Sequence, residues 1–244
     1  MPATLDHWKV LPHGSLVEMD DGILTVAGDI PMPLGNFPRR MTVVRLSGAR
    51  TAIFSAIALP EEDMTRIEEL GRPAFLIVPS DAHRLDAKIW KERYPEISVL
   101  TPPGAREAVS EVAPVDLVSD ELDDSQVRFH VVAGTDDRES ALTVHRDTGT
   151  TLICNDIIGH VRHPHGVGAQ IMARVFGFGV SGPRMPRPVL WQIKHPAALA
   201  QQLHEWAQIP DLKRIIVSHG DPIAADPAGT LEAIASDLER SSVH

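Results

Sequence analysis

Acidic and imidazole side chains follow the ends of several hydrophobic runs in this chain. Each run reads as a strand buried inside a sheet, where both faces are covered by apolar side chains. The residues at these ends are, in chain order, Asp81, His83, Asp136, Asp156 and His219. The pattern predicts that side chains able to bind a metal gather at one edge of a sheet.

The composition limits the classes of protein to consider. With 244 residues, of which 43% are hydrophobic, the chain can bury one sizeable core, so we expect a single domain. A formal net charge of −10 argues against nucleic acid or an anionic membrane as a partner, because both require a basic surface. Cys154 is the single cysteine and stands in an apolar run, so we expect a buried structural thiol.

The first residues of the sequence do not predict a secretory targeting signal. Residues 1–10 contain neither a basic segment nor an apolar one, and no stretch of the chain approaches the ~20 apolar residues of a membrane span. We therefore expect a cytoplasmic protein.

Strands and helices alternate along much of the predicted order. A strand in 22–26 precedes a hairpin, and Pro60 with the acids behind it begins a helix that Gly71 ends. The other predicted elements are the hairpin strands 41–46 and 51–55, strand 74–78, helix 82–94, strand 97–100, a short helix ending near 112, strands 127–133, 141–145 and 151–154, helix 196–208, strand 214–218 and helix 227–239. Two mixed sheets with helices outside satisfy this order.

Residues 159–188 differ in composition from the rest of the chain. They contain several glycines and prolines, a short helix predicted at 169–176, and four basic residues, Arg162, Arg174, Arg184 and Arg187. Inserts of this kind act as lids, as binding loops or as contacts between the subunits of a homodimer. The sequence leaves these three roles open.

The order of these motifs resembles that of the metallo-β-lactamase superfamily. The resemblance rests on residues 75–84, 134–140, 154–156 and 216–222, and it covers nearly the whole chain. It is closest to a divergent branch known as a domain of unknown function, which shares the pattern of residues 40–46. The resemblance implies an α+β fold, the four-layer αββα sandwich, with metal ligands at the ends of strands.

The superfamily signature His-x-His-x-Asp-His is altered in this chain. The resemblance places Pro79 and Arg84 on two of its ligand positions, where neither can bind a metal. The positions that keep a ligand-type side chain, in the signature and after it, are Asp81, His83, Asp136, Asp156 and His219. The resemblance implies that these are the metal ligands, with Asp156 and His219 also catalytic.

Each candidate ligand also has a purely structural interpretation. Asp81 fits an N-cap of the helix that follows it, and Asp136 stands in an acidic run typical of a solvated turn. Asp156 fits a turn-forming residue, and a histidine in the first turn of a helix, as His83 would be, is commonly just exposed. For His219 the following glycine favours a site, because it lets the backbone turn at the sheet edge.

Arg84 lies at a ligand position with a permanent positive charge that repels a cation. We predict that it pairs with Asp156, since a buried aspartate without metal needs a counter-charge. We accordingly expect one divalent ion, zinc, manganese or iron, or no metal.

A second group of histidines, His160, His163 and His165, closely follows Asp156. We take these histidines, together with Arg84, as candidate substrate-binding residues; adventitious metal binding is the alternative. The resemblance implies a metal-dependent hydrolase with altered ligands. Its substrate would be a small molecule, and the arginine-bearing insert suits an anionic one. The alternative function is a metal-free, inactive scaffold that serves as a binding or interaction protein.

Overall fold

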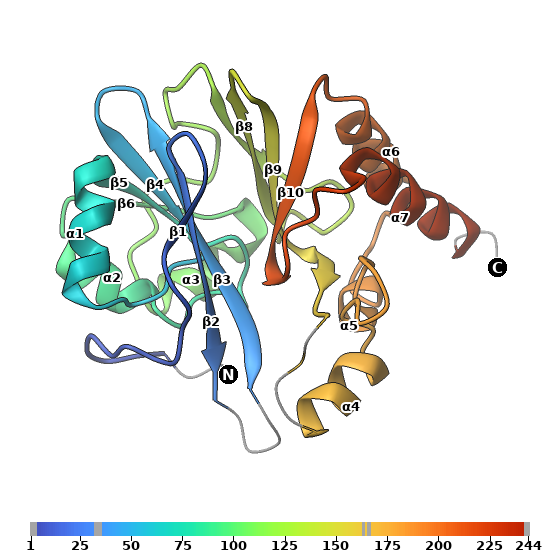
Figure 1. Cartoon of the computed structure of the whole chain (residues 1–244), viewed down its shortest axis with the longest axis horizontal. Coiled ribbons are helices and arrows are strands. Elements are labelled where there is room, and N and C mark those ends of the chain that lie inside the picture. Colours follow the sequence, from blue (N-terminus) through green and yellow to red (C-terminus); the bar gives the residue numbers. More distant parts are fainter. Residues whose placement is uncertain (1–3, 32–35, 163, 165–166, 242–244) are drawn as a thin grey trace.

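Two β-sheets packed face to face form the centre of the computed structural model, which describes residues 4–31, 36–162, 164 and 167–241 (Figure 1). In the described residues the first sheet has six strands in the order β1-β2-β3-β4-β5-β6, and the second has four in the order β10-β9-β8-β7. The strands are β1 (Val17–Asp20), β2 (Ile23–Ile30), β3 (Phe37–Leu46), β4 (Arg50–Phe54), β5 (Arg72–Ile77), β6 (Ser98–Leu100), β7 (Val127–Val131), β8 (Ser140–Arg146), β9 (Gly149–His160) and β10 (Leu212–Gly220).

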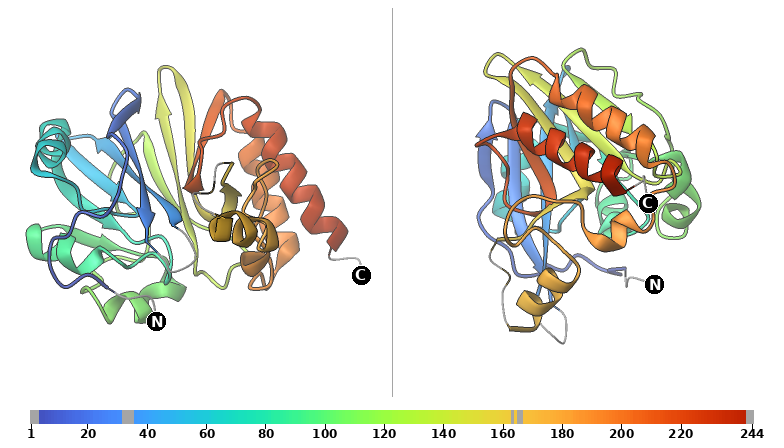
Figure 2. Two further views of the ribbon diagram at one scale, coloured as in Figure 1. Left: turned by 60° about the horizontal axis from the view of Figure 1, so that its bottom comes forward. Right: turned by 90° about the vertical axis from the view of Figure 1, so that its right-hand side faces the viewer.

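Helices cover the outer face of each sheet. Helices α1, α2 and α3 lie on the six-stranded sheet, and α6 and α7 lie across the four-stranded sheet (Figure 2). Their bounds, with those of the 3-10 turn η1 and of two short helices that precede α6, are α1 (Glu61–Leu70), α2 (Ala87–Arg93), η1 (Pro103–Ala105), α3 (Arg106–Ser110), α4 (Val167–Val175), α5 (Arg187–Leu190), α6 (Pro196–Ala207) and α7 (Pro227–Ser241). The expected four-layer αββα sandwich is confirmed. None of the described helices combines the length and the hydropathy needed to cross a membrane.

The alternation of side chains along the strands divides the core into three layers. In β4, Ile53 packs beneath the helices of the first sheet, whereas Ala52 and Phe54 lie between the two sheets. In β9, Ile153 lies between the sheets and Cys154 packs beneath α6 and α7. Both faces of each sheet are therefore buried, which explains why the strands read as continuous apolar runs.

Cys154 is confirmed as a buried, free thiol. Its side chain is 0% exposed, and burial raises the pKa of the thiol far above its ordinary value. The thiol is thus protonated and is suited to packing rather than to nucleophilic chemistry.

Two elements near the strand ends differ from the sequence-based expectation. Strand β9 continues to His160 instead of ending at Cys154, and its parallel pairing with β10 shifts register between the Val217–Cys154 and His219–Gly159 pairs. Bulges of this kind re-aim side chains, and Asp156 lies within the shifted stretch. The second difference is helix α2, which begins at Ala87 rather than near residue 82 and follows turns at residues 81–82 and 85–86.

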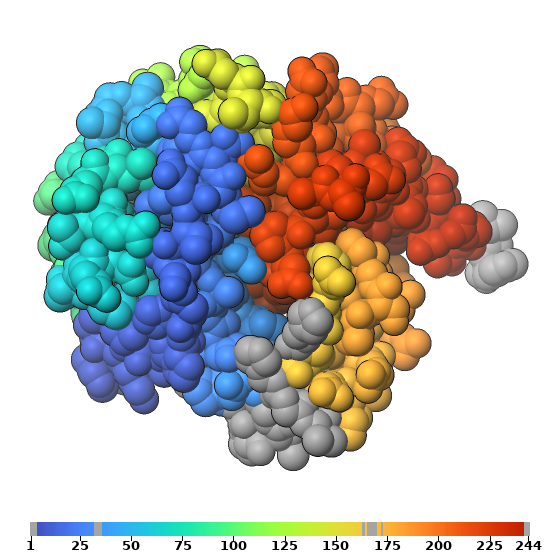
Figure 3. Space-filling model, in the orientation of Figure 1, coloured from blue at the N-terminus to red at the C-terminus, as the bar shows by residue number. Residues whose placement is uncertain are grey.

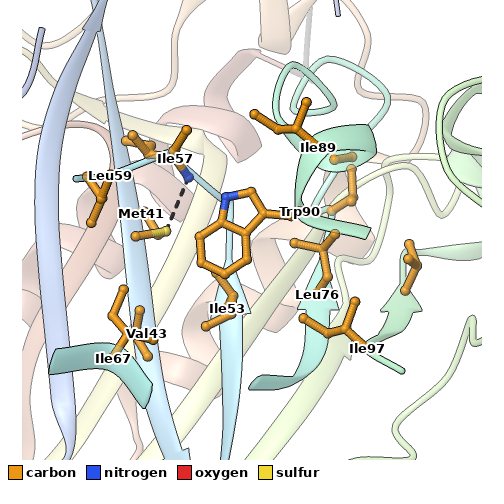
Figure 4. Packing of buried hydrophobic residues seen from close by; sticks show 14 of the residues in the cluster. Met41, Val43, Ile53, Ile57, Leu59, Ile67, Leu76, Ile89, Trp90 and Ile97 are labelled. Carbon is orange, nitrogen blue, oxygen red and sulfur yellow. Dashed lines mark hydrogen bonds between the residues drawn. The ribbon is translucent and has the colours of Figure 1, made fainter. Parts of the chain in front are cut away.

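Trp90 anchors α2 in the outer core layer of the first sheet (Figure 4). Its indole is 0% exposed, and its ring centroid lies 5.6 Å from those of both Trp8 and Tyr94. Nearby, the sulfur of Met41 accepts the backbone N–H of Ile57 at 3.1 Å. This packing holds the beginning of α2, and with it the turns that follow β5, against the sheet.

Replacing Trp90 by alanine should lower the free energy of unfolding by about 3–5 kcal/mol, because it removes a fully buried aromatic side chain and leaves a cavity. Urea denaturation followed by far-ultraviolet circular dichroism measures this change. The matched control is Trp191→Ala, because Trp191 is 72% exposed and its loss should change stability by less than about 0.5 kcal/mol. Equal effects of the two substitutions would contradict the packing role of Trp90.

Candidate metal centre

Three of the predicted ligands meet at one edge of the sandwich. Oδ1 of Asp156 lies 2.8 Å from Nε2 of His219 and 3.1 Å from Nε2 of His83. The two Nε2 atoms are 3.1 Å apart, and among the described residues this is the group whose donor atoms could hold a metal ion. His83 comes from the turns after β5, Asp156 from the bulged stretch of β9, and His219 from β10. The prediction that Asp156 and His219 share an edge is confirmed.

The other ring nitrogen of each histidine already has a partner. Nδ1 of His219 donates to the backbone carbonyl of Pro38 at 2.6 Å, and Nδ1 of His83 lies 2.8 Å from the hydroxyl oxygen of Ser55. Hydrogen bonds of this kind orient a metal-binding imidazole and leave its other nitrogen to face the ion. Both rings therefore present Nε2 to the same point as the carboxylate.

Ser55 reaches His83 through an uncommon backbone conformation. It follows β4 directly with φ of 56°, in the left-handed region that non-glycine residues rarely adopt. Its backbone N–H still donates to the carbonyl of Ile77 on β5, so the turn is fastened to the sheet. Backbone strain of this kind is found at functional sites, where surrounding contacts hold it in place.

Asp156 carries the negative charge of the cluster. Burial by itself would raise the pKa of its carboxyl, but the neighbouring His83 and His219 hold that pKa well below the ordinary value. For His219 burial would lower the pKa of the ring, and the contact with Asp156 outweighs burial and raises it. The carboxyl is therefore ionised at neutral pH, which is the form that attracts a cation.

Glu139 supports the bulged stretch of β9. Its buried carboxylate accepts a hydrogen bond from Nδ2 of Asn155 at 2.8 Å and lies 3.4 Å from the backbone N of Asp156. Nδ2 of Asn155 also lies 3.2 Å from the hydroxyl of Ser80, which joins this stretch to the residues after β5. Burial, with the charge of Asp156 added to it, raises the pKa of Glu139 well above its ordinary value.

Ser55 and Glu139 are not among the residues that the sequence predicted for the site. Glu139 is the residue directly before β8, and this position was the signal that separated it from the solvated acids before it. No comparable signal marks Ser55, because its role comes from the turn after β4 and not from a sequence motif.

Two of the expected ligands lie apart from the cluster. Asp81 is partly exposed and pairs with Arg138 at 3.0 Å. The N-cap interpretation of Asp81 is wrong, because α2 begins several residues later. Asp136 is exposed and adopts φ of 53° in a turn, which agrees with its solvated interpretation.

The expected ion pair between Arg84 and Asp156 is wrong. Nη1 of Arg84 lies 2.6 Å from a carboxylate oxygen of Glu111 and also donates to the carbonyl of Ala108. The turns after β5 direct His83 toward the cluster and Arg84 toward the residues of α3. The charge that was expected to repel a metal therefore points away from the three donors.

The histidines after Asp156 are only partly described. Nδ1 of His160 donates to the backbone carbonyl of Asp221 at 2.9 Å, which ties the end of β9 to the residues after β10. His163 and His165 lie outside the described residues.

A cavity of about 220 Å³ opens onto the donor cluster, somewhat smaller than the ~300–1,000 Å³ of most small-molecule sites. Aromatic rings of Phe37 and Phe178 pack around His219, with centroids 4.6 Å and 6.2 Å from its ring. Pro188 and Val189 of α5 also line the cavity. The segment that carries α4 and α5, drawn in yellow to orange, forms the neighbouring surface beside the end of β10 (Figure 3).

The donor set suits a single divalent ion. Two imidazole nitrogens with one carboxylate oxygen occur in catalytic zinc sites and in non-haem iron sites, and both keep a coordination position open. The arrangement could bind an ion and still expose one of its faces to the cavity.

No protein-family model and no curated protein matches this sequence. Solved structures do match it. The metallo-β-lactamase FIM-1 from Pseudomonas aeruginosa, in its mono-zinc form, has a TM-score of 0.63 and 11% identity, over 97% of this chain and 99% of that chain. The metallo-β-lactamase from Hirschia baltica has a TM-score of 0.60 and 11% identity, over 92% of this chain and 98% of that chain. For the metallo-β-lactamase from Erythrobacter litoralis the TM-score is 0.61 and the identity 13%, over 91% and 96% of the two chains. At such identities the comparison establishes the fold, and nearly the whole chain has the metallo-β-lactamase fold.

Proposed function

We propose that this protein is a metal-dependent hydrolase that binds one divalent ion through Nε2 of His83, Oδ1 of Asp156 and Nε2 of His219. The observation that carries the proposal is the convergence of these three atoms while both Nδ1 atoms have other partners. The similarity of the fold to metallo-β-lactamases, one of them in a mono-zinc form, supports it.

We propose one ion because the other ligand positions of the metallo-β-lactamase signature supply no donor to the cluster. Pro79 has no donor side chain, while Asp81 and Asp136 lie apart from the cluster. Zinc, manganese and iron are the candidate ions. Imidazole donors favour zinc and iron, whereas carboxylate oxygen also suits manganese.

A divalent ion at these donors, with one position open, would lower the pKa of bound water toward neutrality and polarise a carbonyl or phosphoryl oxygen. Asp156 supplies the negative charge that attracts the cation. Ser55 and the carbonyl of Pro38 hold the two rings in one orientation. Phe37 and Phe178 cover part of the site and limit the access of bulk water. Because the cavity is small, we take the substrate to be a small molecule.

Protein purified without a polyhistidine tag should contain a single divalent ion per chain by elemental analysis. His83→Ala and His219→Ala should each lose it, because two remaining donors do not hold a divalent ion tightly. His204→Ala is the matched control, since His204 lies on α6 and contacts Glu232 and Glu239.

Calorimetric titration of chelator-treated protein with zinc, manganese and iron completes this test. One site for at least one of the ions is expected, and Asp81→Asn should leave it unchanged. No binding of any ion would overturn the proposal and favour the metal-free scaffold. Two tight sites would show that Asp81 or Asp136 also takes part.

Replacing Ser55 by alanine should weaken metal affinity about 10–100-fold, because partners of the distal ring nitrogen orient and strengthen a histidine ligand. Competition with a chromophoric chelator measures the affinity. Ser119→Ala is the matched control, since its exposed hydroxyl contacts Glu121. An affinity equal to that of the unmodified protein would mean that Ser55 does not orient His83 for metal binding.

A further inference from the structure

Arg39 lies in the wall between the metal-site cavity and a second, larger one. The second cavity has a volume of about 530 Å³ and lies between the β2 and β3 strands and the residues that follow β9 and β10. Arg39 lines both cavities, and its side chain is only 6% exposed. A ligand that occupied either space would therefore contact this side chain.

One edge of the Arg39 guanidinium is used within the protein. Nη1 forms an ion pair with the buried carboxylate of Asp86, whose other oxygen accepts the backbone N–H of Ala58 at 3.0 Å. Burial raises the pKa of Asp86, although Arg39 and the N–H of Ala58 counteract this. This pair holds the guanidinium in place near the beginning of β3.

The other edge of the guanidinium has no partner. Nε and Nη2 of Arg39 are both buried, and neither has a hydrogen-bond acceptor among the described residues. A buried donor left without a partner is destabilising, so such donors are rare in folded proteins. The Nε and Nη2 hydrogens lie parallel on one side of the guanidinium, which is the geometry that binds a carboxylate or phosphate through two oxygens.

Arg40, the next residue of the strand, is an arginine whose donors bind groups within the protein. Nε and Nη2 of Arg40 donate to the carbonyl of Gly220 at 3.2 Å and 2.9 Å, and Nη1 lies 3.3 Å from the hydroxyl of Thr25. Arg40 thus uses the same edge to join β3 to the end of β10. The corresponding edge of Arg39 has no such acceptor.

The charges around the larger cavity are mixed. Arg39, Arg40 and the exposed Arg162 line it on the positive side, and Asp29 and Asp221 on the negative side. Asp221 raises the pKa of Arg40 against the larger opposing effect of burial, so part of the negative charge is directed to that arginine. Because Asp86 already offsets the charge of Arg39, the charges around the cavity nearly balance, and the case for an anionic group rests on the unpartnered donors of Arg39.

We propose that the Nε and Nη2 edge of Arg39 binds an anionic group, a carboxylate or a phosphate, of the substrate that reacts at the metal centre. The proposal rests on the proposed hydrolase function. Arg39 is linked to the candidate metal centre through the backbone, because the carbonyl of Pro38, one residue earlier in β3, accepts the ring N–H of His219. Arg39 would thus hold the anionic group, while Pro38, the residue before it, orients the metal ligand His219 on β10.

Calorimetric titration of chelator-treated protein with inorganic phosphate and, separately, with succinate tests the anion site without metal. Arg39→Lys keeps a positive charge beside Asp86 but removes the parallel Nε–H and Nη2–H donors. It should therefore weaken binding of the preferred anion by about 10-fold or more. Arg72→Lys is the matched control, since Arg72 is exposed at the start of β5 and lines neither cavity. The anion that binds more tightly identifies the group as phosphate or carboxylate.

Equal affinities of Arg39→Lys and the unmodified protein, or no binding of either anion to the unmodified protein, would overturn the assignment. If Arg39→Lys does not fold, the double variant Arg39→Met with Asp86→Leu removes the buried pair together and takes its place.

The metal titration is repeated on the same variant, whose metal affinity should be unchanged. Anion binding that depends on Arg39 without any metal binding would refute the hydrolase and keep the anion site. Metal binding without anion binding would refute the anion site and leave the hydrolase proposal standing.

Discussion

Burial of both faces of both sheets is the constraint on which the rest of this structure depends. Helices cover the outer faces and the two sheets cover each other, so nearly every position along the strands must be apolar. A charged side chain there would lose its hydration without gaining a partner. Polar groups that act on a ligand are therefore confined to strand ends, to bulges and to the turns beyond them.

The candidate site is shared by the two sheets. Ser55 and His83 come from the first sheet, while Asp156 and His219 come from the second. Its geometry thus depends on contacts that hold the sheets together at this edge. Arg40 binds the carbonyl of Gly220 across the gap, just beyond His219. At the opposite end of β10, Arg214 pairs with the nearly buried Asp20 of β1.

Buried charge in this region follows one rule, which is that each charge has an opposite charge or a set of hydrogen bonds beside it. Asp156 has the two imidazoles, and Asp86 has Arg39. Among the described residues, Nε and Nη2 of Arg39 are buried atoms that lack such a partner. Arg39 lines the cavity onto which the donor cluster opens, so the proposed anion site and the proposed metal site would lie side by side.

The sequence by itself determined the layered fold and most of its elements, because hydrophobic periodicity reports which positions are buried. It also placed His83, Asp156 and His219 at strand ends that meet. It did not separate these three from Asp81 and Asp136, since all five are polar residues after apolar runs. The path of the turns after β5 decided that His83 faces the cluster while Arg84 faces Glu111. The register shift between β9 and β10 decided where Asp156 lies. Ser55 and Arg39 acquired their roles only in the folded chain, because hydrogen bonds between distant segments depend on sheet packing, which no local pattern encodes.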